Sequence, residues 1–435
     1  MNHDYDAIIV GGRVAGSHLA ARLGKYGFRV LLLERAEFPS LPAVSSPIIY
    51  SSTMRLLDEI GADESAYARN TPKLHDVMSV AGGFPAAINI PDYKGRDYAY
   101  AIDRARFDAA LWDTAIGYEN VTGQQNFSVT DLLWDGDTVI GVIGKDKNGE
   151  EVQFTASIVI GADGRFGIVS RKVGAEEKDR YEEYPTSIYY AYWKNVAYLD
   201  DKPTASTYEG DGYGYLVMDS ADGQTVIAVE GRSDVVEPDA GKIEQFYRDI
   251  INKHPELAKR THEAEPVTTV RGMRNIGNSY RQPGGKGWAL VGDAYHQKDP
   301  LDGQGIYNAV ITGKILARQM LKWNKGDISW DEAIEEYDEL SRMKTYGMYK
   351  SLQTSIRRNF YGESDIAVPE WAQEQLARWL LDDEQFKDLI GKMLIREVPA
   401  DYVNLMTPPM IFGAIARGIG KDIEKRVKKR IPFLK

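Results

Sequence analysis

The chain has 435 residues, of which 43% are hydrophobic and 11% aromatic, a composition typical of a globular enzyme with roughly two or three domains. The net charge of −11 argues against a general affinity for nucleic acid, because nucleic-acid recognition needs a basic surface. The chain has no cysteine, which excludes disulfides, cysteine-ligated metal or iron–sulfur sites and a catalytic thiol, so redox chemistry would require a bound organic cofactor.

The first residues lack a basic segment followed by an apolar core, and no stretch reaches about 18 uninterrupted apolar residues. We therefore expect a cytoplasmic protein without a signal peptide or a membrane-spanning helix. No pattern indicates a metal site, and the sequence leaves the oligomeric state open.

A βαβ unit is predicted at the start of the chain, with strands at 7–10 and 29–33 and a helix at 17–25. In its first turn, Gly11 permits a sharp bend and Gly16 lets the helix pack close to the strand, as in dinucleotide-binding proteins. Glu34 follows the second strand and can accept hydrogen bonds from an adenosine ribose. Arg13 replaces the usual second glycine, so either the backbone is displaced from the phosphate or the arginine side chain turns outward.

Helical and extended patterns alternate along the rest of the chain. We expect helices at 51–61 and 104–115, a sheet excursion at 72–102, and meander strands between 121 and 160. A second, sheet-containing domain is expected within 185–270, with strands at 188–193, 213–218 and 225–229 and a helix at 241–253. Beyond Leu301 the pattern is mostly helical.

Two later segments repeat the arrangement of an apolar strand that ends in an aspartate. The run 158–171 ends its strand at Asp163 and Gly164, and the run 290–306 ends its strand at Asp293. A Pro-x-x-Gly-x-Gly turn then opens a helix, and its glycines let backbone amides point at a polar ring or a phosphate. The aspartates can accept hydrogen bonds from ribityl or ribose hydroxyls.

These three segments, in this order over residues 4–325, resemble FAD-dependent oxidoreductases with the para-hydroxybenzoate hydroxylase fold, the group A flavoprotein monooxygenases. The Gly-x-Arg-x-Ala-Gly-Ser variant of the first turn resembles one bacterial subgroup of them. The resemblance implies FAD binding by Gly11, Gly12, Arg13, Ala15, Gly16, Glu34, Arg35, Arg104, Val129, Asp163, Gly164, Asp293, Pro300, Gly303, Gln304 and Gly305. Arg104 and the loop from Pro300 would lie near the isoalloxazine ring.

The resemblance also implies a fold and a reaction. The fold would be α/β, with a discontinuous Rossmann-like FAD-binding domain (1–75, 100–182 and 270–325), an inserted β-sheet substrate domain (76–99 and 183–269) and a helical C-terminal region (326–435). In the resembled family, NADH or NADPH reduces FAD, and a flavin C4a-hydroperoxide oxygenates an aromatic or other electron-rich small molecule. These enzymes lack a separate nicotinamide domain, so the nicotinamide would bind transiently, and a separate flavin reductase is an alternative donor.

Residues near the reacting ring are candidates for catalysis and substrate binding. His296 and Lys298 lie in the loop that would face the flavin and could stabilise a substrate phenolate or the reduced flavin, or only shape the loop. Tyr190, Tyr213 and Tyr215 are candidates for contact with an aromatic or apolar substrate, although alternating aromatic residues on a strand usually just pack.

Three other functions stay open. Geranylgeranyl-reductase-like flavoproteins reduce double bonds, but they carry a Tyr-x-Trp-x-Phe-Pro pattern and often a cysteine, where this chain has Tyr213-Gly-Tyr-Leu-Val-Met218 and no cysteine. Flavin-dependent halogenases use a Trp-x-Trp-x-Ile-Pro segment, which is absent. The basic, apolar-periodic tail 413–435 could contact a membrane as part of a binding role, or it could pack on its own domain or on a second copy.

Overall fold

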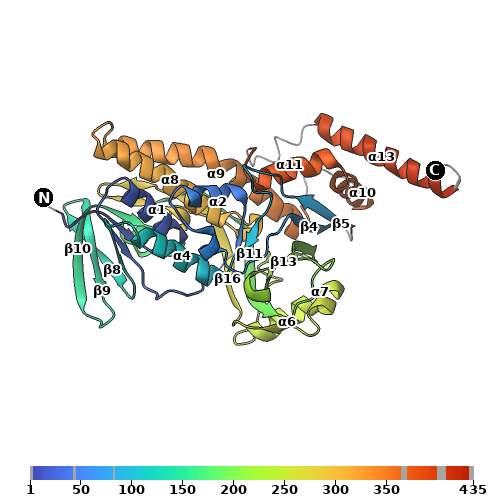
Figure 1. The fold of residues 1–435 in the computed structure, drawn as a ribbon, viewed down its shortest axis with the longest axis horizontal. Coiled ribbons are helices and arrows are strands. Elements are labelled where there is room, and N and C mark those ends of the chain that lie inside the picture. Colours follow the sequence, from blue (N-terminus) through green and yellow to red (C-terminus); the bar gives the residue numbers. More distant parts are fainter. Residues whose placement is uncertain (1–2, 43–45, 82–83, 364–369, 399–407, 431–435) are drawn as a thin grey trace. The chain divides into compact units, whose positions relative to one another are not determined.

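The computed structural model describes residues 3–42, 46–81, 84–363, 370–398 and 408–430. The chain divides into two compact units, each built from three separate segments (Figure 1). The first unit contains the chain up to Thr71 with 102–186 and 272–346, and the second contains 72–101, 187–271 and the chain from Gly347. The region expected to form a separate helical part, 326–435, is therefore shared between the two units.

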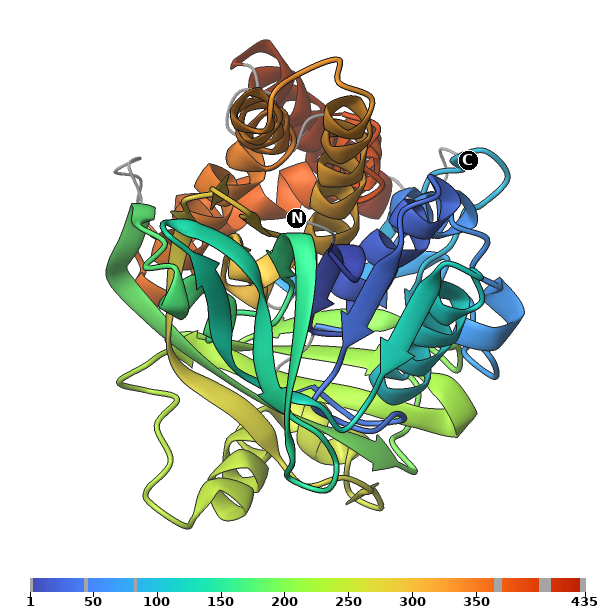
Figure 2. The ribbon, with the colours of Figure 1, turned by 90° about the vertical axis from the view of Figure 1, so that its left-hand side faces the viewer.

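The first unit contains an eight-stranded sheet in the order β17-β18-β10-β1-β2-β7, with β8 and β9 joined through β10. Its strands are β1 (Tyr5–Val10), β2 (Val30–Leu33), β7 (Val121–Gln124), β8 (Ser128–Asp135), β9 (Thr138–Lys145), β10 (Glu151–Gly161), β17 (Gly284–Gly285) and β18 (Trp288–Leu290). The neighbours from β18 to β7 are parallel, whereas β8, β9 and β10 form the expected antiparallel meander, seen as long strands in Figure 2.

Buried side chains explain the parallel core. Ala7, Ile8 and Ile9 of the central strand β1 are fully buried, as a strand covered on both faces requires. The helices of this unit are α1 (Val14–Lys25), α2 (Ser51–Asp58), α3 (Glu64–Tyr67), α4 (Arg104–Ile116), α5 (Ile168–Lys172), α8 (Gly305–Asn324) and the first part of α9 (Trp330–Tyr361). Asp103 begins α4 by accepting hydrogen bonds from the amides of Ala105 and Arg106. Helix α1 begins at Val14, earlier than the Ser17 that was predicted.

The remaining short elements of the first unit are β3 (Ile48–Ile49), β19 (His296–Gln297), η2 (Gly292–Ala294) and η3 (Pro300–Asp302). Two long strands, β11 (Glu177–Lys194) and β16 (Arg271–Arg281), begin in one unit and end in the other. Within the first unit, β16 pairs with β19 through Tyr280 and His296.

The second unit contains the strand order β11-β14-β13-β12-β4-β5, with β15 beside β11. Its elements are β4 (Asp76–Ala81), β5 (Phe84–Asn89), β6 (Tyr100–Ala101), β12 (Ala205–Glu209), β13 (Tyr213–Asp219), η1 (Ala221–Gly223), β14 (Gln224–Arg232), α6 (Ile243–Asn252), α7 (Pro255–Arg260), β15 (Glu265–Pro266), α10 (Glu370–Leu381), α11 (Glu384–Leu394) and α13 (Pro408–Arg430). The expected strands and the helix α6 are present.

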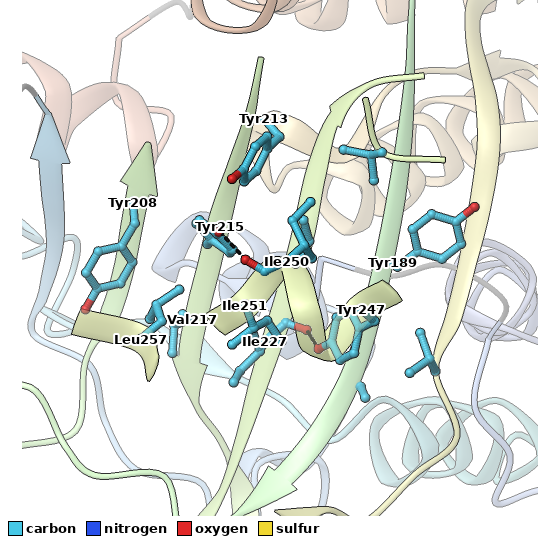
Figure 3. Close-up of a cluster of buried hydrophobic side chains, with 14 of the residues drawn as sticks. Tyr189, Tyr208, Tyr213, Tyr215, Val217, Ile227, Tyr247, Ile250, Ile251 and Leu257 are labelled. Atoms are coloured by element: carbon cyan, nitrogen blue, oxygen red, sulfur yellow. Dashed lines mark hydrogen bonds between the residues drawn. The ribbon is translucent and has the colours of Figure 1, made fainter. Parts of the chain in front are cut away.

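Aromatic side chains fill the core between this sheet and helix α6 (Figure 3). The hydroxyl of Tyr215 donates a hydrogen bond to the carbonyl of Ile250 at 2.6 Å, and Tyr247 donates to the carbonyl of Ile227 at 2.6 Å. Each buried hydroxyl therefore has an acceptor, and the two tyrosines tie the helix to the strands.

Candidate cofactor site

Four of the predicted cofactor residues lie at the carboxyl edge of the parallel sheet. Gly11 follows β1, Glu34 follows β2, Asp163 follows β10 by two residues, and Asp293 lies in η2 just after β18. The strand order β18-β10-β1-β2 makes these four strands neighbours. Segments far apart in the sequence thus meet where open α/β sheets bind ligands.

The first turn has the close packing expected of a dinucleotide site. Gly11 has φ of +105°, and a Cβ there would lie 2.5 Å from the carbonyl oxygen of Ala162. A Cβ on Gly16 would lie 1.8 Å from the carbonyl oxygen of Gly11, so helix α1 could not approach with any larger residue. No side chain of the described residues caps α1, and its first turn has no acidic residue, so its amides can face a pyrophosphate.

Glu34 fixes the shape of this turn. One carboxylate oxygen accepts a hydrogen bond from the amide of Gly12 at 2.8 Å, and the other accepts from the amide of Ala36 at 2.9 Å. A carboxylate has about four acceptor positions, so a buried Glu34 can still accept from a ribose hydroxyl. Arg35 is exposed beside it, and Val129 is half-buried on β8.

The side chain of Arg13 is half-buried against Asp108 and the chain near Ser40, and whether the backbone here is displaced from a phosphate stays a prediction. Its guanidinium donates hydrogen bonds to Asp108 at 2.6 Å and to the carbonyl of Ser40 at 2.9 Å, and it lies over the ring of Phe38. Asp108 also binds Arg104, with Nη2 to Oδ1 at 2.9 Å. The predicted flavin-side arginine is thus buried in an Arg13–Asp108–Arg104 cluster.

Asp163 caps the short helix α5. Its Oδ2 accepts hydrogen bonds from the amides of Ile168 at 2.6 Å and Val169 at 3.2 Å. Its Oδ1 is buried and has no hydrogen-bond partner among the described residues. Burial raises the pKa of Asp163 to about 6, against the lowering effect of these amides. A bound cofactor could supply the missing donor, and Gly164 beside it has open space at its Cα.

Asp293 is the accessible carboxylate of the site. Asp293 is exposed, whereas its neighbours Gly292 and Ala294 are buried. A Cβ on Gly292 would lie 2.7 Å from the Cβ of Ala15, so this loop runs close against helix α1. The protein packed around Asp293 displaces part of its hydration and so raises its pKa, while the charges of Arg165, Lys298, Arg104 and Arg281 lower it. The protein therefore surrounds Asp293 with positive charge but leaves it accessible to a ligand.

The turn that opens α8 has the features expected beside a flat polar ring. Gly303 has φ of +63°, and a Cβ there would lie 2.9 Å from Ile48. Gln304 is buried at the helix start, and no described atom would lie within 4 Å of a Cβ on Gly305. Within the described chain no side chain caps α8, so the amides of Gly305 and Ile306 at the start of this helix can face a ligand.

His296 and Lys298 have protein partners in this structure. The imidazole of His296 stacks on Tyr280 with ring centroids 3.9 Å apart, and burial together with the charge of Lys298 holds the pKa of His296 well below its usual range. The ammonium of Lys298 binds Asp302, one helical turn along the loop. His296 is therefore neutral at neutral pH, and the roles of both residues towards a flavin stay predictions.

Arg165 is a site residue that the sequence analysis did not single out. Its guanidinium donates to the carbonyls of Gly277 at 2.5 Å and Lys298 at 2.7 Å, so it holds the loop that follows Asp293. Its partners lie more than a hundred residues away in the sequence. The only available signal was its position directly after Asp163 and Gly164.

The three candidate substrate tyrosines lie in the second unit. Tyr190, Tyr213 and Tyr215 are all buried, and Tyr213 and Tyr215 belong to the aromatic core of Figure 3. The hydroxyl of Tyr215 is already bound to Ile250. Packing accounts for their burial, and contact with a substrate stays a prediction.

Comparison with known proteins identifies the family. A family model described as "FAD binding domain" matches residues 4–342, which is most of the chain. The protein belongs to this family, and it is an FAD-dependent oxidoreductase. The glycine turn, the uncapped helices and the orphaned oxygen of Asp163 fit such a cofactor.

The curated relatives of this chain have different activities. The chain is 28% identical to digeranylgeranylglycerophospholipid reductase 2 of Methanococcoides burtonii, over 79% of this chain and 81% of the relative. It is 22% identical to a 1H-pyrrole-2-carbonyl-[peptidyl-carrier protein] chlorinase of Pseudomonas fluorescens, over 85% of this chain and 87% of the relative.

Solved structures confirm the fold. The flavin-dependent brominase Bmp2 superposes with a TM-score of 0.75 at 20% identity, covering 96% of this chain and 99% of that chain. The p-nitrophenol 4-monooxygenase PnpA of Pseudomonas putida superposes with a TM-score of 0.72 at 19% identity, covering 94% of this chain and 100% of that chain. The α/β fold with an FAD-binding domain and a helical C-terminal region is therefore as predicted.

Proposed function

We propose that this protein is an FAD-dependent monooxygenase that uses NADH or NADPH and O2 to oxygenate an aromatic or other electron-rich small molecule. The observation that carries the cofactor site is the accessible Asp293 beside the uncapped start of α8. One oxygen atom would enter the substrate, and the other would leave as water with the electrons of the nicotinamide.

In this proposal each part of the sheet edge holds one part of FAD. The start of α1 faces the pyrophosphate, Glu34 binds the adenosine ribose, and Asp293 binds the ribityl chain. Near the pyrophosphate, Asp163 accepts a hydrogen bond from a hydroxyl group of FAD through Oδ1, which has no partner among the described residues. When bound, FAD supplies the redox chemistry, and the loop held by Arg165 fixes where its ring can lie.

The positive charge around Asp293 has a further use in this proposal. Four basic residues act on this carboxylate, and Arg165 has the largest such effect. Such charges favour negative charge on a bound ring or a phenolic substrate. The same charges also help Asp293 to stay ionised, and an ionised carboxylate is the better acceptor for hydroxyl groups.

Reduction of a carbon–carbon double bond in an isoprenoid chain is the second candidate. The observation that favours it is the similarity to the Methanococcoides burtonii reductase over most of both chains. The same FAD site would then pass electrons to the double bond instead of to O2. We place it second because strand β13 lacks the aromatic–proline pattern described above and the chain has no cysteine.

One set of assays separates the two candidates. The purified protein, loaded with FAD, is incubated with NADH or NADPH in air and without O2, with phenols and with geranylgeranyl lipids in turn. Monooxygenation predicts oxygen uptake that depends on an aromatic substrate, and mass spectrometry finds label from isotopically labelled O2 in the product. Hydrogen added to the isoprenoid lipid in the absence of O2 contradicts monooxygenation and supports the reductase.

A further inference from the structure

Helix α13 exposes a continuous apolar stripe. The members of this apolar stripe are Phe412, Ala416, Ile419, Gly420, Ile423 and Val427. Their spacing of three, four and seven residues places them on one face of the helix, and the charged residues between Phe412 and Val427 whose side chains are described, Arg417, Lys421, Asp422 and Glu424, lie outside that face. Phe412 is 70% exposed and Ile423 is 57% exposed, which is unusual for large apolar side chains that have packing partners.

The opposite face of α13 already has its intramolecular contacts. Ala414 is fully buried, and a Cβ on Gly418 would lie 2.4 Å from the indole of Trp379 on α10. Arg417 binds Asp383 at 2.6 Å, and Asp422 accepts a hydrogen bond from Trp379 at 3.0 Å. Figure 1 shows α13 beside α10. The apolar stripe therefore stays exposed to solvent while the other face of α13 packs within its own unit.

The charge of α13 is opposite to that of the chain. Residues 408–430 contain seven Lys or Arg residues and two acidic residues, whereas the whole chain carries −11. Two copies of α13 that paired through their apolar stripes would bring like charges together. An anionic lipid surface instead offers an apolar interior for the stripe and phosphate groups for the basic residues.

We propose that α13 binds the surface of an anionic lipid bilayer, with its axis in the plane of the membrane and the apolar stripe at the boundary between the headgroups and the acyl chains. No helix in the described part of the chain is long and apolar enough to cross a membrane, so the contact is peripheral. The helix keeps its contacts with α10, because the stripe and the packed face point in opposite directions.

Vesicle co-sedimentation of the full-length protein tests this proposal. We expect the protein to pellet with vesicles of phosphatidylcholine and phosphatidylglycerol in equal parts, and to stay in solution with phosphatidylcholine alone. Replacing Phe412 and Ile423 by serine should lower the partition coefficient about tenfold or more, because two large apolar contacts are lost. Met343→Ser on α9 is the matched control, since Met343 is 69% exposed but lies outside α13, and it should bind as the wild type does.

Charge provides an independent arm of the test. Changing Lys425, Lys428 and Lys429 to glutamine should lower binding about fivefold for each lysine, and added salt should lower it further. Equal binding to neutral and anionic vesicles overturns the proposal, as does binding that the serine variants leave unchanged. A concentration-dependent dimer that the serine variants abolish, with no vesicle binding, would assign the stripe to a second copy and also overturn it.

Discussion

Asp108 joins two arginines of the candidate site, so its substitution should lower the stability of the protein. Its carboxylate is fully buried and binds Arg13 at 2.6 Å and Arg104 at 2.9 Å, whose side chains are 27% and 9% exposed. Asp108→Asn keeps the shape but removes the charge and turns an amide NH2 towards guanidinium donors. Breaking a buried ion pair costs about 3–5 kcal/mol, and the partial exposure of Arg13 places the expected loss at about 3 kcal/mol.

Urea unfolding followed by circular dichroism measures this loss, and FAD titration of the same samples measures cofactor affinity. Asp113→Asn is the control, because Asp113 is exposed on the same helix, and it should change the unfolding free energy by less than about 0.5 kcal/mol. Arg13→Gln alone and combined with Asp108→Asn completes a double-mutant cycle, in which we expect coupling of about 1 kcal/mol or more. A loss below about 1 kcal/mol for Asp108→Asn, or strictly additive effects, would refute the reasoning.

Four further predictions follow from single contacts. Asp293→Ala should weaken FAD binding in a fluorescence titration while urea unfolding of the FAD-free protein stays unchanged; unaltered FAD affinity contradicts the assigned role. Gly16→Ala should abolish soluble, FAD-loaded protein because of the clash in the first turn, whereas Gly305→Ala should leave stability intact and lower only FAD affinity. Because burial raises the pKa of Asp163 to about 6, this carboxyl group binds more protons in the folded state than in the unfolded state, so its contribution to stability falls as pH rises from about 4 to about 6. In urea unfolding at several pH values, Asp163→Asn should lack this fall in stability. A pH profile identical to that of the wild type would contradict the raised pKa. Tyr215→Phe removes the hydrogen bond to Ile250 and should lower the free energy of unfolding by about 1 kcal/mol while leaving KM unchanged. A raised KM would instead support the predicted contact between Tyr215 and the substrate.

Much of the fold could be predicted because it depends on local patterns. A strand end or a helix start is indicated within a few residues by the apolar run before Gly11, by the carboxylate of Glu34 and by the glycine turn after Pro300. The resemblance to FAD-dependent oxidoreductases implied one site for Gly11, Glu34, Asp163 and Asp293, and the parallel strands place these residues at one edge of the sheet.

The contacts of individual side chains could not be predicted in the same way. The sequence left open whether the backbone at Arg13 is displaced or its side chain turns outward, and the acceptor that this side chain binds, Asp108, lies 95 residues away. Asp163 also caps α5, and this contact could not be predicted because the sequence did not indicate where that short helix begins. Arg165 donates to two backbone carbonyls, and because every residue has a backbone carbonyl, the sequence does not indicate which ones Arg165 binds.

The order of strands in the first sheet has a consequence for how the protein is made. Strand β18 lies beside β10 in space, but the ribosome adds it only after the middle segment of the second unit, 187–271, is complete. Until then the nascent chain holds β1, β2 and β10, but residues 159–161 of β10 lack their β18 partner and Asp293 is missing. A chain truncated before Trp288 would lack both β18 and Asp293, so the FAD site can be completed only after the middle segment of the second unit has been synthesised.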